Sequence, residues 1–200
     1  MRKVLLAVIA SVSMGCATAA AAEALVLRPY PGPPAWKLVT NKVAGLQFLR
    51  ELIPADQRIE TYRDILTAQS FPQNRGVDPS VYLRNVFAAA GQACDGLRVN
   101  GPTARREGGR AVAYGQIYCG RQKGQATGAI MMFKAISGTD SLYVVQREFR
   151  VPPSATPGVV SGSAAAMAAH AKAAAAADAY LLNSVYLCGA GMAEPRCARR

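Results

Sequence analysis

The sequence predicts an α+β fold, in which an antiparallel sheet of about five to seven strands packs with a mid-chain helix and a long alanine-rich C-terminal helix. Residues 111–119, 126–136 and 141–151 show a period-two pattern rich in β-branched and aromatic residues, which is typical of strands. A short turn at residues 137–140 joins the last two. Strands joined by short turns pair antiparallel, so these three segments are expected to form the centre of the sheet.

Two more strands are expected earlier in the chain, at residues 36–43 and 46–53, followed by a helical turn and a strand within residues 59–71. A proline-rich lead-in at residues 23–34 precedes them. Because proline fixes φ and lacks a backbone donor, we expect an extended segment that covers a sheet edge. Docking of a partner by its prolines and aromatic residues is the alternative.

The mid-chain helix is expected to begin at Asp78 and to end near Cys94. An aspartate can accept hydrogen bonds from the free N–H groups of the first turn, and Pro79 suits the first helical position. Residues 97–99 are interpreted as a short strand. The glycines, proline and arginines of residues 101–110 predict a basic loop.

The C-terminal helix is expected at residues 163–187, after a linker rich in Pro, Ser and Gly at residues 152–162. Its first half is nearly all alanine, the residue with the highest helix propensity. A chain of 200 residues suits one domain, which we place at residues 35–188. Residues 189–200 form a basic C-terminal tail.

Residues 1–22 have the pattern of a signal peptide that directs export. Arg2 and Lys3 precede a short apolar stretch, and small residues with an Ala-x-Ala site precede Glu23. The apolar stretch is too short to span the ~30 Å core of a bilayer, so no transmembrane segment is expected after cleavage. The expected location is the periplasm, with lipid attachment at Cys16 as the alternative.

The four cysteines of the mature chain predict two disulfides, because an even number of cysteines is typical of exported proteins. These residues are Cys94, Cys119, Cys188 and Cys197. Three connectivities are open, and we favour Cys94–Cys119 and Cys188–Cys197. The first pair would join the end of the helix to the end of a core strand, and the second would close a short loop.

Several segments together resemble a known family: Trp36, residues 65–71, the helix that ends at Cys94, Tyr118–Cys119, and residues 141–150. They resemble uncharacterised exported proteins of Gram-negative bacteria, a family similar to the PsbP-like α/β/α sandwich. The resemblance implies an antiparallel sheet flanked by helices. It brings no catalytic residues to this chain.

Recognisable catalytic motifs are absent from the sequence: it contains no nucleophile elbow, phosphate-binding loop, dinucleotide fingerprint or zinc-protease motif. The one histidine, His170, lies in the alanine helix, and a metal site would need partners that the pattern does not show. We therefore predict no catalytic residue, no cofactor and no metal, and favour a protein that is not an enzyme. The alternative is an envelope-associated hydrolase or transferase whose site forms only in three dimensions, with Tyr143 and Arg147 as candidates.

Three basic residues, Lys134, Arg147 and Arg150, lie in strands that are otherwise suited to burial, and Lys134 and Arg147 are the two that lie in mid-strand without an easy structural explanation. Together with Tyr143 they mark a candidate ligand face, although a solvated or ion-paired sheet face is the interpretation that we favour. A charge buried between helix and sheet needs a partner. Asp178 of the C-terminal helix is the candidate carboxylate for Arg147, provided that this helix packs on the same face.

The chain has 23 Lys and Arg against 12 Asp and Glu, a net charge of +11. We favour the interpretation that this charge serves solubility. Partners are unknown from the sequence; an envelope protein or an anionic envelope surface would also suit the charge, whereas nucleic acid is not expected for an exported chain. The function is likewise unknown from the sequence. The leading hypothesis is a non-enzymatic exported binding or accessory protein of the bacterial envelope, and a secreted factor that acts on a host is a further one.

Overall fold

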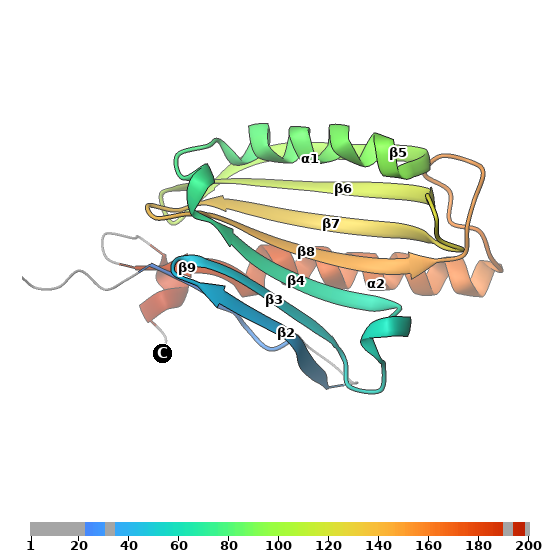
Figure 1. The fold of residues 1–200 in the computed structure, drawn as a ribbon, viewed down its shortest axis with the longest axis horizontal. Coiled ribbons are helices and arrows are strands. Elements are labelled where there is room, and N and C mark those ends of the chain that lie inside the picture. The colour runs from blue at the N-terminus through green and yellow to red at the C-terminus, as the bar shows by residue number, and fades with distance from the viewer. Residues whose placement is uncertain (1–22, 31–34, 190–193, 199–200) are drawn as a thin grey trace, which may run out of the picture.

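A computed structural model describes residues 23–30, 35–189 and 194–198. Its main feature is a seven-stranded antiparallel sheet with the strand order β2-β3-β4-β8-β7-β6-β5 (Figure 1). The strands are β2 (Trp36–Ala44), β3 (Gln47–Pro54), β4 (Asp64–Phe71), β5 (Cys94–Glu107), β6 (Arg110–Gln122), β7 (Gly128–Ser137) and β8 (Leu142–Val151). The predicted α+β class is confirmed, with the predicted meander as β6, β7 and β8 near the centre of the sheet.

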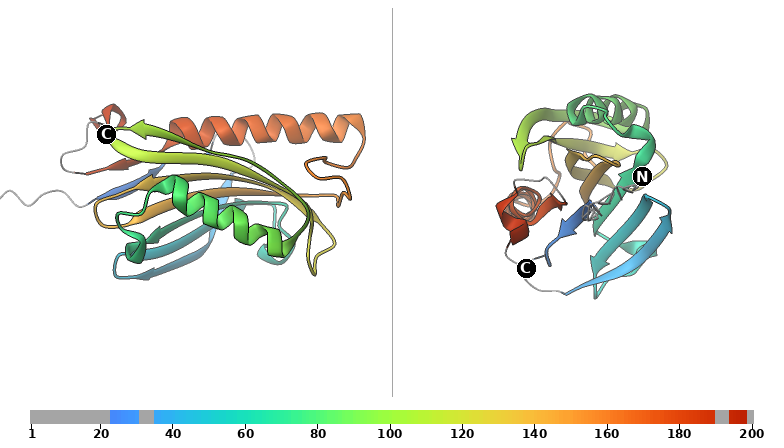
Figure 2. Two further views of the ribbon diagram at one scale, coloured as in Figure 1. Left: turned by 90° about the horizontal axis from the view of Figure 1, so that it is seen from above. Right: turned by 90° about the vertical axis from the view of Figure 1, so that its left-hand side faces the viewer.

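Two helices cover opposite faces of this sheet (Figure 2). Helix α1 (Pro79–Ala93) packs over β5, β6 and β7 on one face, and α2 (Ala164–Ser184) packs over β7 on the other. Side chains of β7 are buried on both faces: Phe133 packs with α1, whereas Met132 belongs to the core that includes α2. Because α1 covers only β5 to β7, the same face of β8 and β4 is left without a helix above it (Figure 1).

Helix α1 begins as the sequence predicts. The side chain of Asp78 accepts hydrogen bonds from the backbone N–H groups of Ser80 and Val81, at 2.8 and 3.2 Å. The helix buries Leu83 and Phe87 against the sheet. A disulfide between the residue that follows α1 and a residue of β6 then fixes the C-terminal end of the helix to the sheet. It joins Cys94 to Cys119 with a Cα–Cα distance of 5.4 Å, and we call it the helix disulfide.

A second, two-stranded sheet was not predicted. Strand β1 (Ala24–Leu27) pairs antiparallel with β9 (Val185–Cys188). The expected helix at residues 163–187 is therefore wrong in its last turn: α2 ends at Ser184, because the β-branched and aromatic residues that follow pair with β1. The described part of the lead-in is extended, as expected: β1 pairs with β9, and Leu25 and Leu27 pack against the core that includes α2. That the lead-in covers a sheet edge stays a prediction.

The predicted basic loop at residues 101–110 is wrong as well. Strand β5 continues through it to Glu107, and only Gly108 and Gly109 form the turn into β6. A bulge between Asn100 and Thr103 takes up Pro102. Proline is tolerated there because β5 is the edge strand, where a missing N–H donor breaks no ladder hydrogen bond.

Within the described ranges, no helix is both long and apolar enough to cross a membrane. The predicted signal peptide, including Cys16, lies outside the described residues.

Candidate functional site

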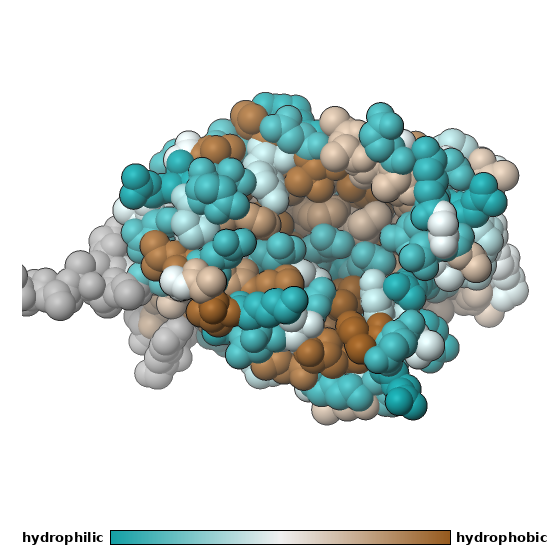
Figure 3. All heavy atoms as spheres, in the orientation of Figure 1, coloured by the Kyte–Doolittle hydropathy of each residue, from teal (hydrophilic) through white to brown (hydrophobic). Residues whose placement is uncertain are grey.

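A cleft of about 540 Å³ lies between α1 and the part of the sheet that α1 leaves uncovered. Figure 3 shows the hollow below α1, with brown and pale side chains above it and a band of hydrophilic side chains below. Fifteen residues line it: Tyr62, Val86, Ala89, Ala90, Ala93, Cys94, Ile117, Gln122, Lys123, Gln125, Met131, Phe133, Gln146, Glu148 and Arg150. Its volume falls within the range of about 300–1,000 Å³ that is typical of small-molecule sites.

One wall of the cleft is apolar and comes from α1. Val86, Ala89 and Ala90 lie along the side of the helix that faces the uncovered strands. Short alanine side chains leave open the space that larger residues would fill. Met131 and Phe133 of β7 continue the apolar surface onto the sheet, so an aliphatic or aromatic body would meet carbon on two sides.

The opposite side of the cleft is polar and centres on Glu148 of β8. This residue is only 8% exposed. Its two carboxylate oxygens accept from the side-chain amides of Gln122, at 3.5 Å, and Gln146, at 3.4 Å. Burial raises the pKa of Glu148, while the positive charge of Arg150 opposes that rise. A buried carboxyl group with perturbed ionisation in a cleft is typical of functional sites.

Arg150 and Tyr62 close one end of the polar side. The Arg150 guanidinium lies over the Tyr62 ring, 3.9 Å from its centroid. Burial raises the pKa of Tyr62, and the nearby negative charge of Glu148 adds to the rise. The Arg150 Nε atom is buried and has no hydrogen-bond acceptor among the described residues. Arg150 lines the cleft, so the terminal N–H groups of its guanidinium are the donors that it can offer to a bound molecule.

The lining can bind through hydrogen bonds, but it offers few groups for covalent chemistry. It contains one carboxyl group and no serine, threonine or histidine, and its one cysteine, Cys94, is held in the helix disulfide. Nucleophilic catalysis usually needs a nucleophile beside a base, and general acid–base catalysis needs groups that converge on the reacting atoms. No group of three or more metal-binding side chains is found in the part of the chain that the structure describes.

Sequence reasoning missed this cleft. It singled out Arg147 on β8 but not Gln146 and Glu148, which project to the opposite face because successive side chains of a strand alternate. The usable signal was a run of polar residues at alternate positions, Gln146, Glu148 and Arg150, within a strand otherwise suited to burial. What the pattern did not reveal is that α1 stops short of them.

The residues of the predicted ligand face lie on the other side of the sheet, toward α2. Lys134 is fully buried. Its amine donates to the carbonyls of Leu181 and Val185, at 3.0 and 2.6 Å, and to Glu107, at 2.7 Å. Burial lowers the pKa of Lys134 to about 8, against the raising effect of the Glu107 carboxylate. Lys134 thus ties the C-terminal end of α2 to the sheet.

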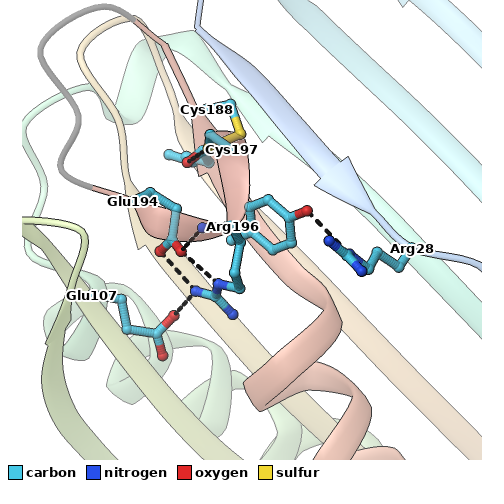
Figure 4. Close-up of a disulfide and its surroundings, with 8 residues drawn as sticks. Arg28, Glu107, Cys188, Glu194, Arg196 and Cys197 are labelled. Carbon is cyan, nitrogen blue, oxygen red and sulfur yellow. Dashed lines mark hydrogen bonds and ion pairs between the residues drawn. A yellow bond between two sulfur atoms is a disulfide. The ribbon is translucent and has the colours of Figure 1, made fainter. Parts of the chain in front are cut away.

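The C-terminal segment completes this arrangement (Figure 4). Cys188 and Cys197 form the second disulfide, here called the tail disulfide, with a Cα–Cα distance of 5.7 Å. It holds Arg196 where the guanidinium donates to Glu194, at 2.6 and 2.8 Å, and to Glu107, at 3.2 Å. Both disulfides therefore follow the pairing that the sequence analysis favoured.

Arg147 is paired, but not with the predicted residue. Its guanidinium makes a bidentate contact with Asp64 of β4, at 3.0 and 2.5 Å, and lies 3.8 Å from the centroid of the Tyr30 ring. The expectation of an Arg147–Asp178 pair is wrong. Asp178 accepts instead from the side-chain amide of Gln116, at 2.8 Å. Burial raises the pKa of Asp64, and Arg147 opposes that rise.

Tyr143, the third residue of the predicted ligand face, is 6% exposed and packs against Phe48, with 6.3 Å between ring centroids. Burial raises its pKa to about 12, helped by the charge of Glu23. Lys134 and Arg147 each have internal charged partners. A ligand at these three residues stays a prediction.

No family model matches the chain, and no curated protein matches it. Among solved structures, the chain is similar to LpqN of Mycobacterium tuberculosis, a protein described as involved in cell envelope biogenesis. The two share 12% sequence identity over 85% of each chain, with a TM-score of 0.40. At that TM-score the likeness supports no argument about function, and the resemblance to PsbP-like sandwiches stays a prediction.

Proposed function

We propose that this chain is an exported, non-enzymatic binding protein of the bacterial envelope, and that it binds a small ligand in the cleft between α1 and the sheet. The observation that supports the proposal best is the cleft itself: about 540 Å³, apolar on the α1 side and polar around a buried carboxyl group. Concave sites of this size with a few convergent polar groups are the usual location of ligand binding.

The two disulfides support export, because stable disulfides are typical of oxidising compartments. The predicted signal peptide points to the periplasm in particular. An interaction with a macromolecular partner, such as an envelope protein or an anionic envelope surface, stays a prediction from the net charge of +11.

The alternative, a hydrolase or transferase, gains one observation from the structure. A cleft with convergent polar groups is the feature that such an enzyme would need. However, Arg147 and Tyr143, its candidate residues, are buried on the opposite face, and the cleft lining lacks serine, threonine and histidine. We therefore favour binding over catalysis.

A pair of tryptophan variants on α1 tests the proposal. Ala88 and Ala89 are both exposed, but only Ala89 lines the cleft. Ala89→Trp is expected to fill the cleft, whereas Ala88→Trp places the same side chain on the helix outside it. The uncharged dye Nile red should bind the wild type and Ala88→Trp with enhanced fluorescence, and Ala89→Trp at least tenfold more weakly. Equal dye binding by all three proteins would refute a binding site in the cleft.

A further inference from the structure

We propose that the cleft selects a small uncharged ligand that carries a secondary amide on an aliphatic body. This inference rests on the proposed function and assigns the chemistry of the ligand. Such a ligand suits the hydrogen-bonding capacity of the lining, its balance of charge, and the apolar wall that α1 provides.

The carboxylate of Glu148 has capacity for a donor. Four charged side chains are buried in the described residues: Lys134, Arg147, Glu148 and Glu194. The other three have ion pairs at 2.7, 2.5 and 2.6 Å, but no cationic side chain among the described residues lies within 4.0 Å of Glu148. Its two amide contacts, at 3.4 and 3.5 Å, are longer than the usual 2.7–3.2 Å of a hydrogen bond. A ligand N–H group would supply the missing short contact.

The guanidinium of Arg150 has capacity for an acceptor. Arg150 lines the cleft, and stacking on Tyr62 holds its guanidinium in place. A guanidinium carries five N–H donors and no acceptor, so its terminal N–H groups favour an acceptor oxygen in the cleft. A carbonyl oxygen of the ligand meets this requirement.

The charge of the inner lining is balanced, which favours an uncharged ligand. Glu148 and Arg150 carry opposite charges on the same face of β8. A cationic ligand would be repelled by Arg150, and an anionic one by Glu148, with little solvent between them to weaken the repulsion. The other charged residue of the lining, Lys123, is exposed, where solvent and salt screen its charge.

An amide satisfies these requirements in one group, because its N–H donates and its C=O accepts without a net charge. The facing wall of Val86, Ala89 and Ala90 has only carbon in its side chains. It therefore suits an aliphatic substituent on the amide, which would gain about 25 cal/mol for each Å² of apolar surface that it removes from water.

Three probes with the same leucine body separate the possibilities: N-acetylleucine amide is neutral, leucine amide is a cation, and N-acetylleucine is an anion. Each is titrated into the purified, disulfide-bonded protein and followed by NMR shifts of backbone amides. The neutral probe is expected to shift resonances of the cleft residues and to bind at least tenfold more tightly than either charged probe. Tightest binding by the cation or by the anion would overturn the inference, and so would equal binding of all three.

Two variants connect the preference to the named groups. Glu148→Gln removes the charged acceptor and Arg150→Met removes the donor, and each is expected to weaken the neutral probe about tenfold or more, as the loss of a charged hydrogen bond does. Unchanged affinity in both variants would contradict the assignment.

Nile red binding separates the amide assignment from the proposed binding function. If the dye still discriminates Ala89→Trp from Ala88→Trp while no leucine probe binds, the amide assignment fails alone; if the dye fails too, the binding function fails with it.

Discussion

Replacement of Lys134 by methionine tests how the buried charges on the α2 side contribute to stability. Lys134 is fully buried, and its amine makes three hydrogen bonds. Methionine keeps a similar unbranched shape but has no donor. The variant leaves the carbonyls of Leu181 and Val185 without this partner, whereas Glu107 keeps Arg196 and Tyr114.

The expected loss follows from these contacts. Removing one partner of a buried ion pair costs about 3–5 kcal/mol, mostly because the other group stays buried without compensation. Since Glu107 retains two partners here, we expect a value near the lower end, about 3 kcal/mol. For a protein of this size each kcal/mol lowers the melting temperature by about 2–4 °C, which predicts a decrease of about 6–12 °C.

The pH dependence provides a second, independent signature. The pKa of Lys134 is about 8 in the folded protein and 10.5 when exposed, so between these values the unfolded chain binds more protons than the folded one. Stability from this group therefore rises as the pH rises through that window. At 1.36 kcal/mol per unit, the 1.5 units from pH 8 to 9.5 correspond to about 2 kcal/mol. Lys134→Met lacks this contribution, so the stability difference between wild type and variant should widen by that amount.

Equilibrium unfolding in urea at pH 7, 8 and 9.5, without reductant, measures both effects. Lys172→Met is the matched control, because it makes the same substitution at an exposed lysine of α2. Its loss should change the free energy of unfolding by less than about 0.5 kcal/mol. A Lys134→Met protein as stable as this control, or a stability difference that does not change with pH, would refute the reasoning.

The remaining predictions also concern stability. The helix and tail disulfides close loops of 25 and 9 residues. Replacing both cysteines of a disulfide by serine should therefore lower the free energy of unfolding by about 3.5 kcal/mol for the helix disulfide and by about 2.6 kcal/mol for the tail disulfide. Urea unfolding measures both values, and the reverse order would contradict the chain-entropy estimate. Arg147→Met leaves the Asp64 carboxylate unpaired, and should lower the free energy of unfolding by about 3 kcal/mol. Glu148→Gln should raise it by about 1 kcal/mol at pH 7, since it removes a buried charge without an ion pair. Burial raises the pKa of Glu148 in the folded protein above its usual value of 4.5. The contribution of Glu148 to the free energy of unfolding therefore falls as the pH rises from the unfolded-state pKa to the folded-state pKa. In Glu148→Gln this decrease should be absent.

The central part of the fold could be predicted because its strands alternate side chains regularly. In β7 and β8 that alternation showed which residues share a face, and the structure places Met132 and Phe133 on opposite faces accordingly. Helix α1 could be predicted from its cap at Asp78. These signals are local, so the sequence contains them in full.

The elements that sequence reasoning missed depend on pairing between distant residues. Strand β1 lies next to β9 only because residues about 160 positions apart meet, as in the pairing of Leu25 with Leu187. Strand β5 continues past Pro102 because β6 provides a partner on one side only. The Asp64 partner of Arg147 comes from the neighbouring strand β4, which the pattern did not align with β8.

Under the proposed function, β8 would contribute to structure through Arg147 and to binding through Glu148. They are adjacent residues of β8 and therefore project to opposite faces of the sheet. On the α2 face, Arg147 is enclosed by Asp64 and aromatic rings, so its charge is compensated within the protein. On the α1 face, Glu148 accepts two long amide contacts, has no ion pair among the described residues, and lines the cleft. Opposite changes in stability are therefore expected when the two neighbours are neutralised. A buried charge that costs stability is the kind of trade-off that is common at functional sites.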